Sequence, residues 1–387
     1  MLEDLRYLDV VKKMNLAVPG SSSGSLLWKP AGAALYENLR NFILEKHIEA
    51  GYSQVKSPSL VDLSLFERSG HNLKYKENMF IMDDIALRPM SCPNHILIYE
   101  SQQYSFRDLP VKLFEFGEVF RNEASGSLQM LFRQRQFCQD DSHVFAKSSD
   151  IKELLKNYLE MCANVYSKLG FNDVEYVISL RPEQKFGSED LWDKAEMYLK
   201  EACDDMNLKY SIEEGGGAFY GPKIELKVKD KLGRYWQLGV IQLDYVLPER
   251  FNLYYINEKN EKEMPIILHH AVLGSLERMI GILLEVFEGD IPEYLHPIKA
   301  VVLPVSEKAI DYAKILQKSL IKDKKYHINE CIVDSSKESL QKRIALNSQK
   351  YIPNIYVVGE KEAKEYEENS VIKAMLRQKG KNVQWIL

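Results

Sequence analysis

Hydrophobic and polar residues alternate along two neighbouring segments, LFEFGEVFRNE at 113–123 and RQRQFCQDDSHVF at 133–145. Because side chains alternate faces along a strand, the odd-numbered positions of the two segments share one face. That face is almost wholly polar and contains Arg121, Glu123, Arg133, Arg135, Phe137, Gln139, Asp141 and His143. With AlaSerGlySer as turn residues between them, the segments predict a long antiparallel hairpin. A functional face and an ordinary solvated sheet face would both give this alternation.

Apolar residues at helical spacing predict helices over residues 30–50, 151–169 and 188–206. The segment HHAVLGSLERMIGILLEVFEG, residues 269–289, is apolar on most sides and predicts a further, buried helix. Gly274 and Ser275 inside it indicate a close packing partner, and Arg278 falls one turn later. Strands are expected at 51–61, where Pro58 indicates an edge or a junction, at 174–180, and on both sides of the turn at 229–233.

The pattern changes after GDIPEYLHP, residues 289–297, which has the composition of a linker. Predicted strands at 298–305, 326–333 and 354–359 alternate with helices at 307–320 and 337–350, and two short strands follow. This order is typical of a small α/β module. The body before it combines long antiparallel strands with helices. We therefore expect an α+β domain at residues 1–296 and an α/β domain at residues 297–387.

Composition indicates a globular chain of 387 residues, 45% hydrophobic and 28% charged, enough for two or three domains. The chain has no apolar run of about 18 residues, no signal-peptide layout at its start, and no CxxC pair among its five cysteines. We expect a cytoplasmic protein with reduced thiols and no membrane partner.

The net charge of −5 hides an asymmetry. Residues 298–387 carry 17 Lys and Arg against 11 Asp and Glu, a balance of +6, and the remainder carries 34 against 45, a balance of −11. An anionic partner of the C-terminal module is compatible with this balance, as is an ordinary solvated surface.

Common nucleotide and hydrolase signatures are absent: the sequence has no GxxxxGK[ST], GxGxxG, GxSxG or HExxH. A nucleotide site would therefore have to be built from side chains on a sheet. Arginine suits this role, because a guanidinium binds phosphate with two parallel hydrogen bonds and stacks on a base. Arg121 near Glu123, Arg133 and the distant Arg278 form such a set.

Three segments together resemble the motifs of class II aminoacyl-tRNA synthetases. Phe120 with ArgAsnGluAlaSerGly, then ArgGlnArgGlnPhe and GlnAspAspSerHis, resembles motif 2; GlyTyrSerGlnValLysSerPro at 51–58 resembles motif 1; GlySerLeuGluArg at 274–278 resembles motif 3. The segments at 88–95, 218–224 and 236–244 are similar to those of the threonyl-tRNA synthetase branch. The resemblance implies a catalytic antiparallel sheet flanked by helices, an anticodon-binding α/β domain, and a homodimer formed through motif 1.

The resemblance also implies a zinc ion held by Cys92, His143 and His269. Spacing alone would leave these residues as a buried cysteine and two ordinary histidines, because gaps of 51 and 126 residues form no local metal signature. In this family, three protein ligands leave an open position at which zinc binds the amino and hydroxyl groups of L-threonine. The other residues implied to contact threonine are Met90, Gln139, Asp141, Tyr220, Gln242 and Ser275. His270, next to His269, is the alternative ligand that must be distinguished.

For ATP, the resemblance implies that Arg121 contacts the α-phosphate and the threonine carboxylate, with Arg278 on the γ-phosphate side and Mg²⁺ between the phosphates. Glu123 would bind the adenine amino group, and Arg133 with Gln237 would hold the rest of the nucleotide. The product is threonyl-adenylate, from which threonine passes to tRNA(Thr). Lys223 resembles a family active-site lysine, whereas His71 and His95 are expected to be structural.

The resemblance is loosest in the C-terminal module. Its helix SerLysGluSerLeuGlnLysArgIleAlaLeuAsn fits the family's anticodon-reading helix poorly, and Lys337, Lys342 and Arg343 are expected to contact phosphates instead. Full-length relatives carry additional N-terminal domains, one of which hydrolyses Ser-tRNA, and the present chain is expected to lack that editing domain. Two alternatives stay open: a paralogue that loads threonine onto a carrier other than tRNA, and a non-catalytic tRNA-binding relative.

Overall fold

The computed structural model describes residues 6–72, 76–230, 232–322, 327, 329–361, 364, 376–378 and 383–386. The chain divides into two units, which we call the core unit and the C-terminal unit. The core unit comprises Pro19–Leu26 and Arg40–Ile282. The C-terminal unit comprises Met1–Val18, Leu27–Leu39 and Leu283–Leu387.

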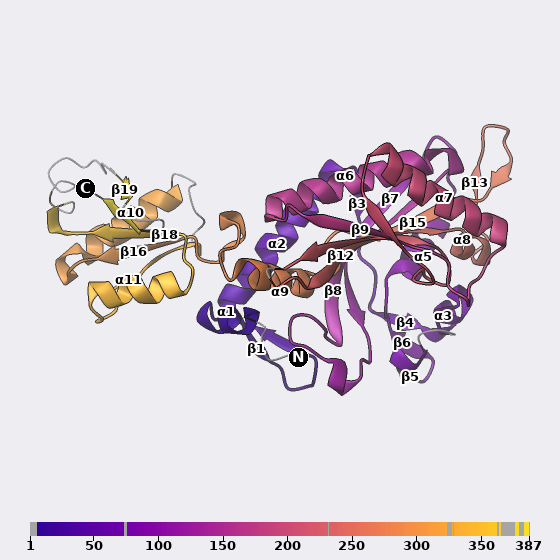
Figure 1. Ribbon diagram of the computed structural model, residues 1–387. Helices are drawn as coiled ribbons and strands as arrows, with labels where there is room; N and C mark the ends of the chain where they lie inside the picture. The colour runs from indigo at the N-terminus through magenta and orange to yellow at the C-terminus, as the bar shows by residue number, and fades with distance from the viewer. Residues whose placement is uncertain are drawn as a thin grey trace. The chain divides into compact units, whose positions relative to one another are not determined.

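An eight-stranded, mostly antiparallel sheet forms the centre of the core unit (Figure 1). Its strands, in spatial order, are β10 (Tyr210–Glu213), β9 (Val174–Ser179), β11 (Lys223–Lys229), β12 (Tyr235–Asp244), β15 (Ile266–Ala271), β8 (Gln136–Ala146), β7 (Val111–Phe120) and β3 (Ser53–Gln54). Only the outer pairs, β10 with β9 and β3 with β7, are parallel. The α+β class predicted for the body is confirmed.

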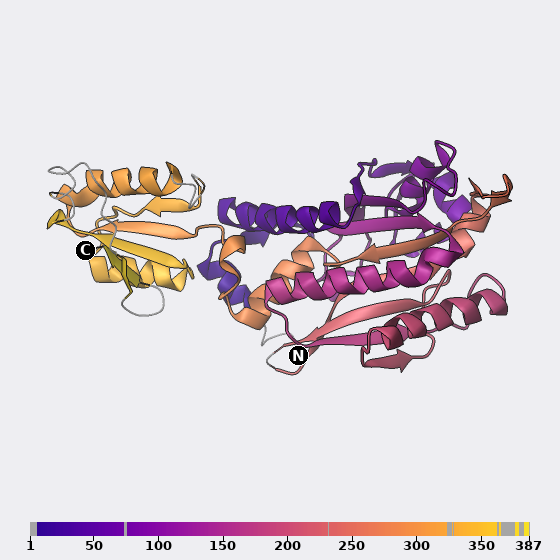
Figure 2. The ribbon, with the colours of Figure 1, turned by 90° about the horizontal axis from the view of Figure 1, so that it is seen from above.

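Two long helices, α6 (Ile151–Leu169) and α7 (Glu189–Asp205), lie side by side along one face of this sheet (Figures 1 and 2). The hydroxyls of Tyr158 and Tyr166 on α6 donate to the carbonyls of Ala271 and Val272 at 3.0 and 2.6 Å. A Cβ at Gly239 would lie 2.5 Å from the Tyr166 hydroxyl, so only glycine lets α6 approach the sheet this closely.

The opposite face carries α5 (Cys92–Glu100), α3 (Leu63–Ser69), α8 (Val246–Arg250) and a small sheet of β4 (Leu60–Asp62), β6 (Ile85–Leu87) and β5 (Phe80–Met82). A buried apolar cluster joins these elements to the large sheet and includes Phe66, Ile96, Leu113, Phe145 and Leu247. A Pro at the second position of α5 suits a helix start, because its missing N–H would be unpaired there anyway. The cluster therefore fixes Cys92, the first residue of α5, against the sheet.

The predicted hairpin at 113–145 exists, but its strands are shorter than the parity argument assumed. β7 ends at Phe120 and β8 begins at Gln136, so Arg133 and Arg135 lie in the connecting loop with Arg121 and Glu123. The AlaSerGlySer segment, residues 124–127, itself contains a 3₁₀ turn at Ser125–Ser127, and further turns follow it in place of a tight reversal. Strand parity therefore explains the placement of Phe137, Gln139, Asp141 and His143 on β8, but not that of the four charged residues in the loop.

The predicted helix at 269–289 is wrong in its first third. Residues up to Ala271 belong to β15, and α9 spans only Leu276–Phe287. Gly274 lies in the intervening turn with φ +82°, and the Ser275 hydroxyl accepts a hydrogen bond from the Arg278 N–H at 3.2 Å, as a helix N-cap does. The small residues mark a helix start, and the close packing partner expected beside them is the Leu238 backbone of β12, whose carbonyl oxygen would lie 2.8 Å from a Cβ at Gly274. Likewise, the single strand expected at 51–61 is two strands, β3 and β4, on either side of Pro58.

In the C-terminal unit, a sheet with the order β17 (Cys331–Val333), β16 (Ala300–Pro304), β18 (Asn354–Val358), β20 (Val383–Ile386) and β19 (Leu376–Gln378) is parallel except for its last pair. Helix α10 (Ile310–Lys322) packs on one face with Ala300 and Val302, and α11 (Leu340–Gln349) packs on the other with Val301 and Leu303 (Figure 2). Strand β16 is apolar at every position because helices cover both of its faces. The α/β module predicted from the sequence is confirmed.

The remaining elements are α1 (Tyr7–Lys13), β1 (Ala17–Pro19) with β2 (Leu26–Trp28), α2 (Pro30–Glu49), and the hairpin of β13 (Tyr255–Ile256) and β14 (Lys262–Glu263). All five cysteines are free and buried, which agrees with the predicted absence of disulfides. Among the described residues, no helix is both long enough and apolar enough to cross a membrane.

His47, near the end of α2, is a buried histidine on the α6 side of the large sheet. Its ring stacks on Phe114 of β7 with centroids 4.0 Å apart, and its Nδ1 hydrogen bonds to the Ile43 carbonyl at 2.9 Å. Burial lowers the pKa of His47 to about 4. The neutral ring is therefore the form that the folded core unit accommodates.

We predict that His47 contributes a pH-dependent part of the stability. A lowered histidine pKa gives stability that is complete above the unfolded value of 6.5 and is lost as pH falls towards about 4. That loss amounts to about 3 kcal/mol in the free energy of unfolding. Urea titrations at pH 7 and pH 4 should show a smaller decline for His47→Phe than for the unsubstituted protein. Equal declines in both proteins would contradict the prediction.

Candidate functional site

The strand register places a row of polar side chains across the middle of the large sheet. His143 on β8 pairs with His269 on β15, His269 pairs with Gln242 on β12, and Gln242 pairs with Lys223 on β11. Directly opposite residues on neighbouring strands have Cβ atoms only about 5 Å apart. Residues separated by up to 126 positions in the sequence are thereby brought into contact.

Cys92 joins the two histidines from the helical layer. One ligand atom each from Cys92, His143 and His269 lies within 4.8 Å of the other two, and all three residues are buried. A thiol and two imidazoles are donors that Zn²⁺ prefers, and three protein ligands leave a fourth position open. By donor chemistry and geometry, the residues implied by the family resemblance fit a zinc ion.

Each of the three groups is held by a further polar side chain. His269 Nε2 lies 2.8 Å from Asp244 Oδ2, His143 Nδ1 lies 2.8 Å from His95 Nδ1, and Cys92 Sγ lies 3.6 Å from His71 Nε2. Metal-binding histidines commonly have such partners, which fix the ring orientation and the tautomer. Asp244 was not among the residues predicted from the sequence, and His71 and His95 were expected to be structural. Asp244 lies two residues after Gln242 on the same predicted strand and therefore on the same face, and this spacing could have predicted its place beside the site.

His270 points to the other face of the sheet and is excluded from this cluster. Its Nε2 lies 2.7 Å from the Tyr52 hydroxyl, and its ring packs against Tyr158 of α6. His269 therefore lies in the cluster and His270 does not, because the two residues follow each other on a strand and alternate faces there.

A cavity of about 340 Å³ opens beside the cysteine and the histidines. Five of the six residues expected to contact threonine line it: Met90, Gln139, Asp141, Tyr220 and Gln242. The Tyr220 hydroxyl hydrogen bonds to Gln242 Oε1 at 2.5 Å. Asp141 Oδ1 lies 3.9 Å from His143 Nε2, and burial raises the pKa of the Asp141 carboxyl. Lys223 also lines this cavity, where its Nζ is 2.9 Å from Glu225 Oε1.

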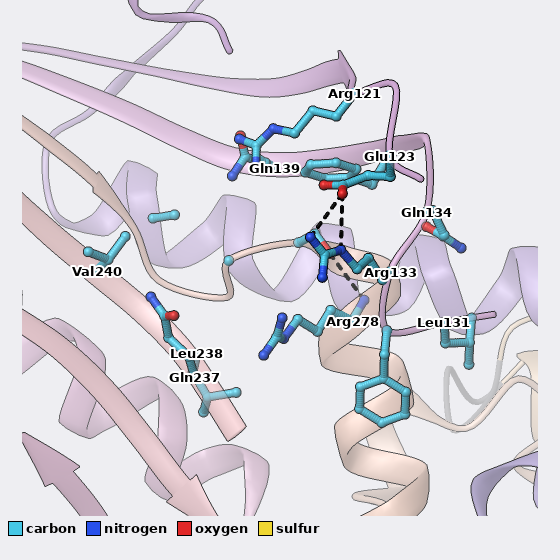
Figure 3. A pocket seen from close by; sticks show the side chains of 15 residues that line it. Arg121, Glu123, Leu131, Arg133, Gln134, Gln139, Gln237, Leu238, Val240 and Arg278 are labelled. Carbon is cyan, nitrogen blue, oxygen red and sulfur yellow. Dashed lines mark hydrogen bonds and ion pairs between the residues drawn. The ribbon is translucent and has the colours of Figure 1, made fainter. Parts of the chain in front are cut away.

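A second cavity of about 330 Å³ adjoins the first and shares Arg121, Gln139, Val240 and Ala271 with it. All five residues expected to contact ATP line it: Arg121, Glu123, Arg133, Gln237 and Arg278 (Figure 3). Ser275, expected beside threonine, lines this second cavity instead of the first. The two cavities therefore adjoin each other, with Arg121 and Gln139 among the residues that line both, and we refer to them together as the cleft.

The arginines in the second cavity are held in different ways. Arg133 forms an ion pair with Glu123 at 2.9 Å, and the Arg121 guanidinium lies over the Phe137 ring with its Nε 3.2 Å from the Pro89 carbonyl. Burial and the nearby charge of Arg133 lower the pKa of Arg278. Within the described part of the chain, Arg278 Nε is buried without a hydrogen-bond partner. A buried cationic donor of this kind favours an anionic ligand.

Strand parity predicts that the even-numbered Gln134 and Asp140 lie on the face opposite the site, but both contribute to the cleft. Gln134 lines the second cavity. The Asp140 carboxylate accepts hydrogen bonds from the backbone N–H groups of Val272 and Leu273 at 2.8 and 2.9 Å, which holds the turn before α9. Burial raises the pKa of Asp140 to about 7, even though these two donors act in the opposite direction. Asp140 therefore supports the wall of the cleft from behind.

Arg343 in the C-terminal unit is not available to a phosphate. The residue is buried, and its guanidinium donates to the backbone carbonyls of Pro304, Asp334 and Glu338 at 2.7, 2.8 and 3.2 Å. The expectation that Arg343 contacts phosphate is therefore wrong, because its guanidinium is bonded to these three carbonyls and connects α11 to the end of β16 and to the loop before α11. Lys342 is exposed and pairs with Glu338 at 2.9 Å.

Comparison with known proteins assigns the chain to a family. Residues 75–287 match the class II tRNA synthetase core domain of the G, H, P, S and T group, and residues 299–383 match the anticodon-binding domain. The chain belongs to the class II aminoacyl-tRNA synthetases. Within that class it is threonyl-tRNA synthetase-like.

Individual relatives support this placement. The chain is 42% identical over 363 residues to the threonine–tRNA ligase of Campylobacter concisus (strain 13826), covering 93% of this chain and 59% of that protein. It is 40% identical to the threonine–tRNA ligase of Ehrlichia chaffeensis (strain ATCC CRL-10679 / Arkansas), covering 92% and 56%. The chain thus spans less than three fifths of the length of these curated relatives.

A solved structure gives the same result for the fold. The RNA-binding domain of threonyl-tRNA synthetase from Cryptosporidium parvum Iowa II superimposes with a TM-score of 0.88 at 37% identity, covering 93% of this chain and 90% of that one. Giardia lamblia prolyl-tRNA synthetase in complex with prolyl-adenylate superimposes with a TM-score of 0.71, but at 16% identity it shares the fold alone.

We predict that Gly274→Ala destabilises the protein and distorts the cleft. The residue has φ +82°, and a Cβ there would lie 2.8 Å from the Leu238 carbonyl oxygen on β12. Left-handed backbone at a residue other than glycine typically costs about 1 to 3 kcal/mol, and the contact with a backbone atom adds to this. Thermal unfolding should show a lower Tm for the variant.

Gly215→Ala is the matched control for this prediction. Gly215 also has a positive φ, +74°, but a Cβ there would meet nothing within 4 Å. Gly274→Ala should therefore lower the Tm more than Gly215→Ala does. Equal decreases would mean that contact with β12 makes no contribution.

Proposed function

We propose that the chain catalyses the two steps of threonine–tRNA ligation: activation of L-threonine with ATP to threonyl-adenylate, and transfer of threonine to tRNA(Thr). The observation that carries the proposal is that two cavities adjoin and share lining residues, one beside a Cys/His/His cluster and one lined by arginines. Such a cleft suits an amino acid at one end and a nucleotide at the other, with the reacting groups meeting near Arg121.

At the amino-acid end, Cys92, His143 and His269 would hold zinc. Bound zinc would supply a Lewis-acid position for the amino and hydroxyl groups of threonine. Asp141, which lines the same cavity, would accept a hydrogen bond from the threonine hydroxyl, and Gln139 and Gln242 would position the amino group. Met90 and Tyr220 would close the pocket around the side-chain methyl group.

At the nucleotide end, the chain would act by positioning and by neutralising charge. The threonine carboxylate attacks the α-phosphate of ATP, pyrophosphate leaves, and no protein atom needs to be bonded covalently. Arg121 would contact the α-phosphate and the carboxylate, and Arg278 the γ-phosphate side, and Mg²⁺ bound with ATP would neutralise further phosphate charge. Glu123 would bind the adenine amino group once Arg133 turns from its ion pair towards the nucleotide, and Gln237 would contact the ribose side. Ser275 would support Arg278 from the N-cap of α9.

The anticodon-binding match at 299–383 supports tRNA as the acceptor. We propose a domain boundary at 296/297, which falls between the two family matches, ending at 287 and beginning at 299. Lys337 and Lys342 would contact phosphates, which positions an RNA without reading its bases. We also propose a homodimer formed through residues 51–58, because β3 is the edge strand of the large sheet and exposed strand edges are normally covered.

A paralogue that loads threonine onto another carrier would have the same cleft. It differs only in the acceptor, and the poor match of the α11 segment to an anticodon-reading helix keeps this alternative open. A non-catalytic relative is disfavoured by the complete set of arginines and metal-binding side chains in the cleft. Charging of a tRNA(Thr) transcript distinguishes the ligase from the carrier-loading paralogue.

We predict threonine-dependent exchange of pyrophosphate into ATP. Arg278→Ala should lower kcat/KM roughly 100-fold to 1000-fold, the usual cost of removing one preorganised charge-stabilising donor. Lys308→Ala, a change at an exposed residue of the C-terminal unit, should leave exchange unaltered. No exchange in the unsubstituted protein would favour the non-catalytic alternative, and exchange without tRNA charging would favour the carrier-loading one.

We predict that valine is rejected far more strongly than serine in the same assay. A site that binds a substrate hydroxyl discriminates by roughly 10⁴-fold against an analogue that lacks it, whereas a lost methyl group alters binding by only about 1 to 3 kcal/mol. Serine keeps the hydroxyl and should be activated measurably. If valine supported exchange as well as serine does, metal-based reading of the hydroxyl would be wrong.

A further inference from the structure

A chain of buried hydrogen bonds leads away from His143 on the side opposite its Nε2. His143 Nδ1 lies 2.8 Å from His95 Nδ1, and His95 Nε2 lies 3.1 Å from Glu115 Oε2. The Arg88 guanidinium contacts both Glu115 oxygens, at 3.1 and 3.2 Å. All four side chains are buried, with exposed fractions of 2% or less. Buried polar groups connected in this way define one arrangement of donors and acceptors.

The carboxylate at the end of this chain sets the direction of its hydrogen bonds. Burial alone would raise the pKa of Glu115, but hydrogen bonds from His95, Arg88 and Ser57 outweigh it and lower the value to about 2. The ionised carboxylate only accepts hydrogen bonds, so His95 Nε2 carries the proton directed at it. In the neutral ring, His95 Nδ1 is then an acceptor, and the proton between the two histidines belongs to His143 Nδ1.

This proton position also determines the state of the other His143 nitrogen, Nε2. With a proton on Nδ1, the lone pair of the neutral ring is on Nε2, the atom 3.9 Å from Asp141 Oδ1 beside the cleft. His269 has the opposite tautomer, because its Nε2 carries the proton and donates to Asp244 Oδ2 at 2.8 Å. Its Nδ1 is therefore the acceptor. Asp244 is fixed in turn by the N–H groups of Val246 and Leu247 at 2.7 and 2.9 Å.

We propose that His95, held by Glu115 and Arg88, is a positioning residue that fixes the tautomer and orientation of His143, so that His143 binds the metal through Nε2 while His269 binds it through Nδ1. This inference rests on the proposed zinc site and adds the atoms and the supporting residue. His95 acts only through His143 and does not contact the metal or threonine.

The row of buried hydrogen bonds also connects the metal site to residues 51–58, the segment that resembles motif 1. Glu115 accepts hydrogen bonds from the Ser57 N–H at 3.0 Å and the Ser57 hydroxyl at 2.7 Å, and Asn94 Nδ2 donates to the Pro58 carbonyl at 3.0 Å. Displacement of residues 57–58 would therefore move the carboxylate that orients His95. Ser57→Ala should weaken zinc binding less than a change at His95, because Arg88 still holds Glu115.

The test is zinc affinity, measured on the full 387-residue chain by competition with a chromophoric chelator. His95→Phe keeps a ring of similar shape but removes both nitrogens, and it should weaken zinc binding roughly 10-fold to 100-fold, as loss of a supporting residue usually does. His95→Gln can accept from His143 and donate to Glu115 through its amide, and it should recover most of the affinity. His47→Phe, at a buried histidine stacked on Phe114 on the α6 side of the sheet, is the control and should bind zinc as the unsubstituted protein does.

The outcomes separate the two proposals. If the unsubstituted protein does not bind zinc, the metal site and this inference are both wrong. If it binds zinc and His95→Phe binds it equally well, the metal site stands and the role of His95 is overturned. Should His95→Phe fail to fold, as judged by its circular dichroism and Tm, Glu115→Gln replaces it. An amide there donates as well as accepts, so His95 loses its fixed direction, and a similar loss of affinity is expected.

A spectroscopic measurement tests the ligand atoms themselves. In protein labelled with ¹⁵N in its imidazoles and loaded with ¹¹³Cd, the metal should couple to Nε2 of His143 and to Nδ1 of His269, with resonances assigned from single-histidine variants. In His95→Phe, the His143 coupling should weaken or divide between the two nitrogens. Coupling of the metal to Nδ1 of His143 in the unsubstituted protein would overturn the proposal.

Discussion

The register of three antiparallel strands is the constraint on which the rest of the cleft depends. β8, β15 and β12 pair so that His143, His269 and Gln242 stand side by side on one face. A shift of one residue between any two of these strands would send one member of the row to the α6 face, where His270 already lies against Tyr158. The tight contact of Tyr166 with Gly239 and the buried cluster below β8 both oppose such a shift.

The same register explains why the two cavities of the cleft adjoin each other. Side chains at alternate positions of β8 run from His143 past Asp141 to Gln139, that is, from the cysteine and histidine cluster to the edge of the arginine-lined cavity. Arg121 comes from the loop after β7 and Arg278 from the first turn of α9, so the charged groups gather where strands end and backbone geometry is less regular. A rigid row of strand residues would select the amino acid, and loop and helix-end residues would hold the nucleotide.

The sequence predicted much of this arrangement, and the failures have physical causes. Periodicity predicted α2, α6 and α7 to within a residue at each end, because apolar residues recur at helical spacing in each of them. It failed at 269–289, where a buried strand and a buried helix are both apolar and only the turn at Gly274 separates them.

Strand parity selected Gln139, Asp141 and His143 correctly but could not place Arg121 or Arg133, which lie in a loop. The cluster of Cys92 with two distant histidines depends on tertiary packing, so family resemblance was the only route to it. His95, Asp244 and Asp140 act through other residues, and their roles appear only in three dimensions.

The central claim is that Cys92, His143 and His269 form a zinc site that reads threonine beside an arginine-lined nucleotide cavity. A crystal structure of the chain soaked with L-threonine, with anomalous data collected on both sides of the zinc absorption edge, tests it most directly. One anomalous peak is expected at about 2.0 to 2.3 Å from the Cys92 sulfur and from one nitrogen of each histidine, with the amino and hydroxyl groups of threonine completing the coordination. Threonine bound in the cleft with no metal at these three residues, or zinc bound only elsewhere, would contradict it.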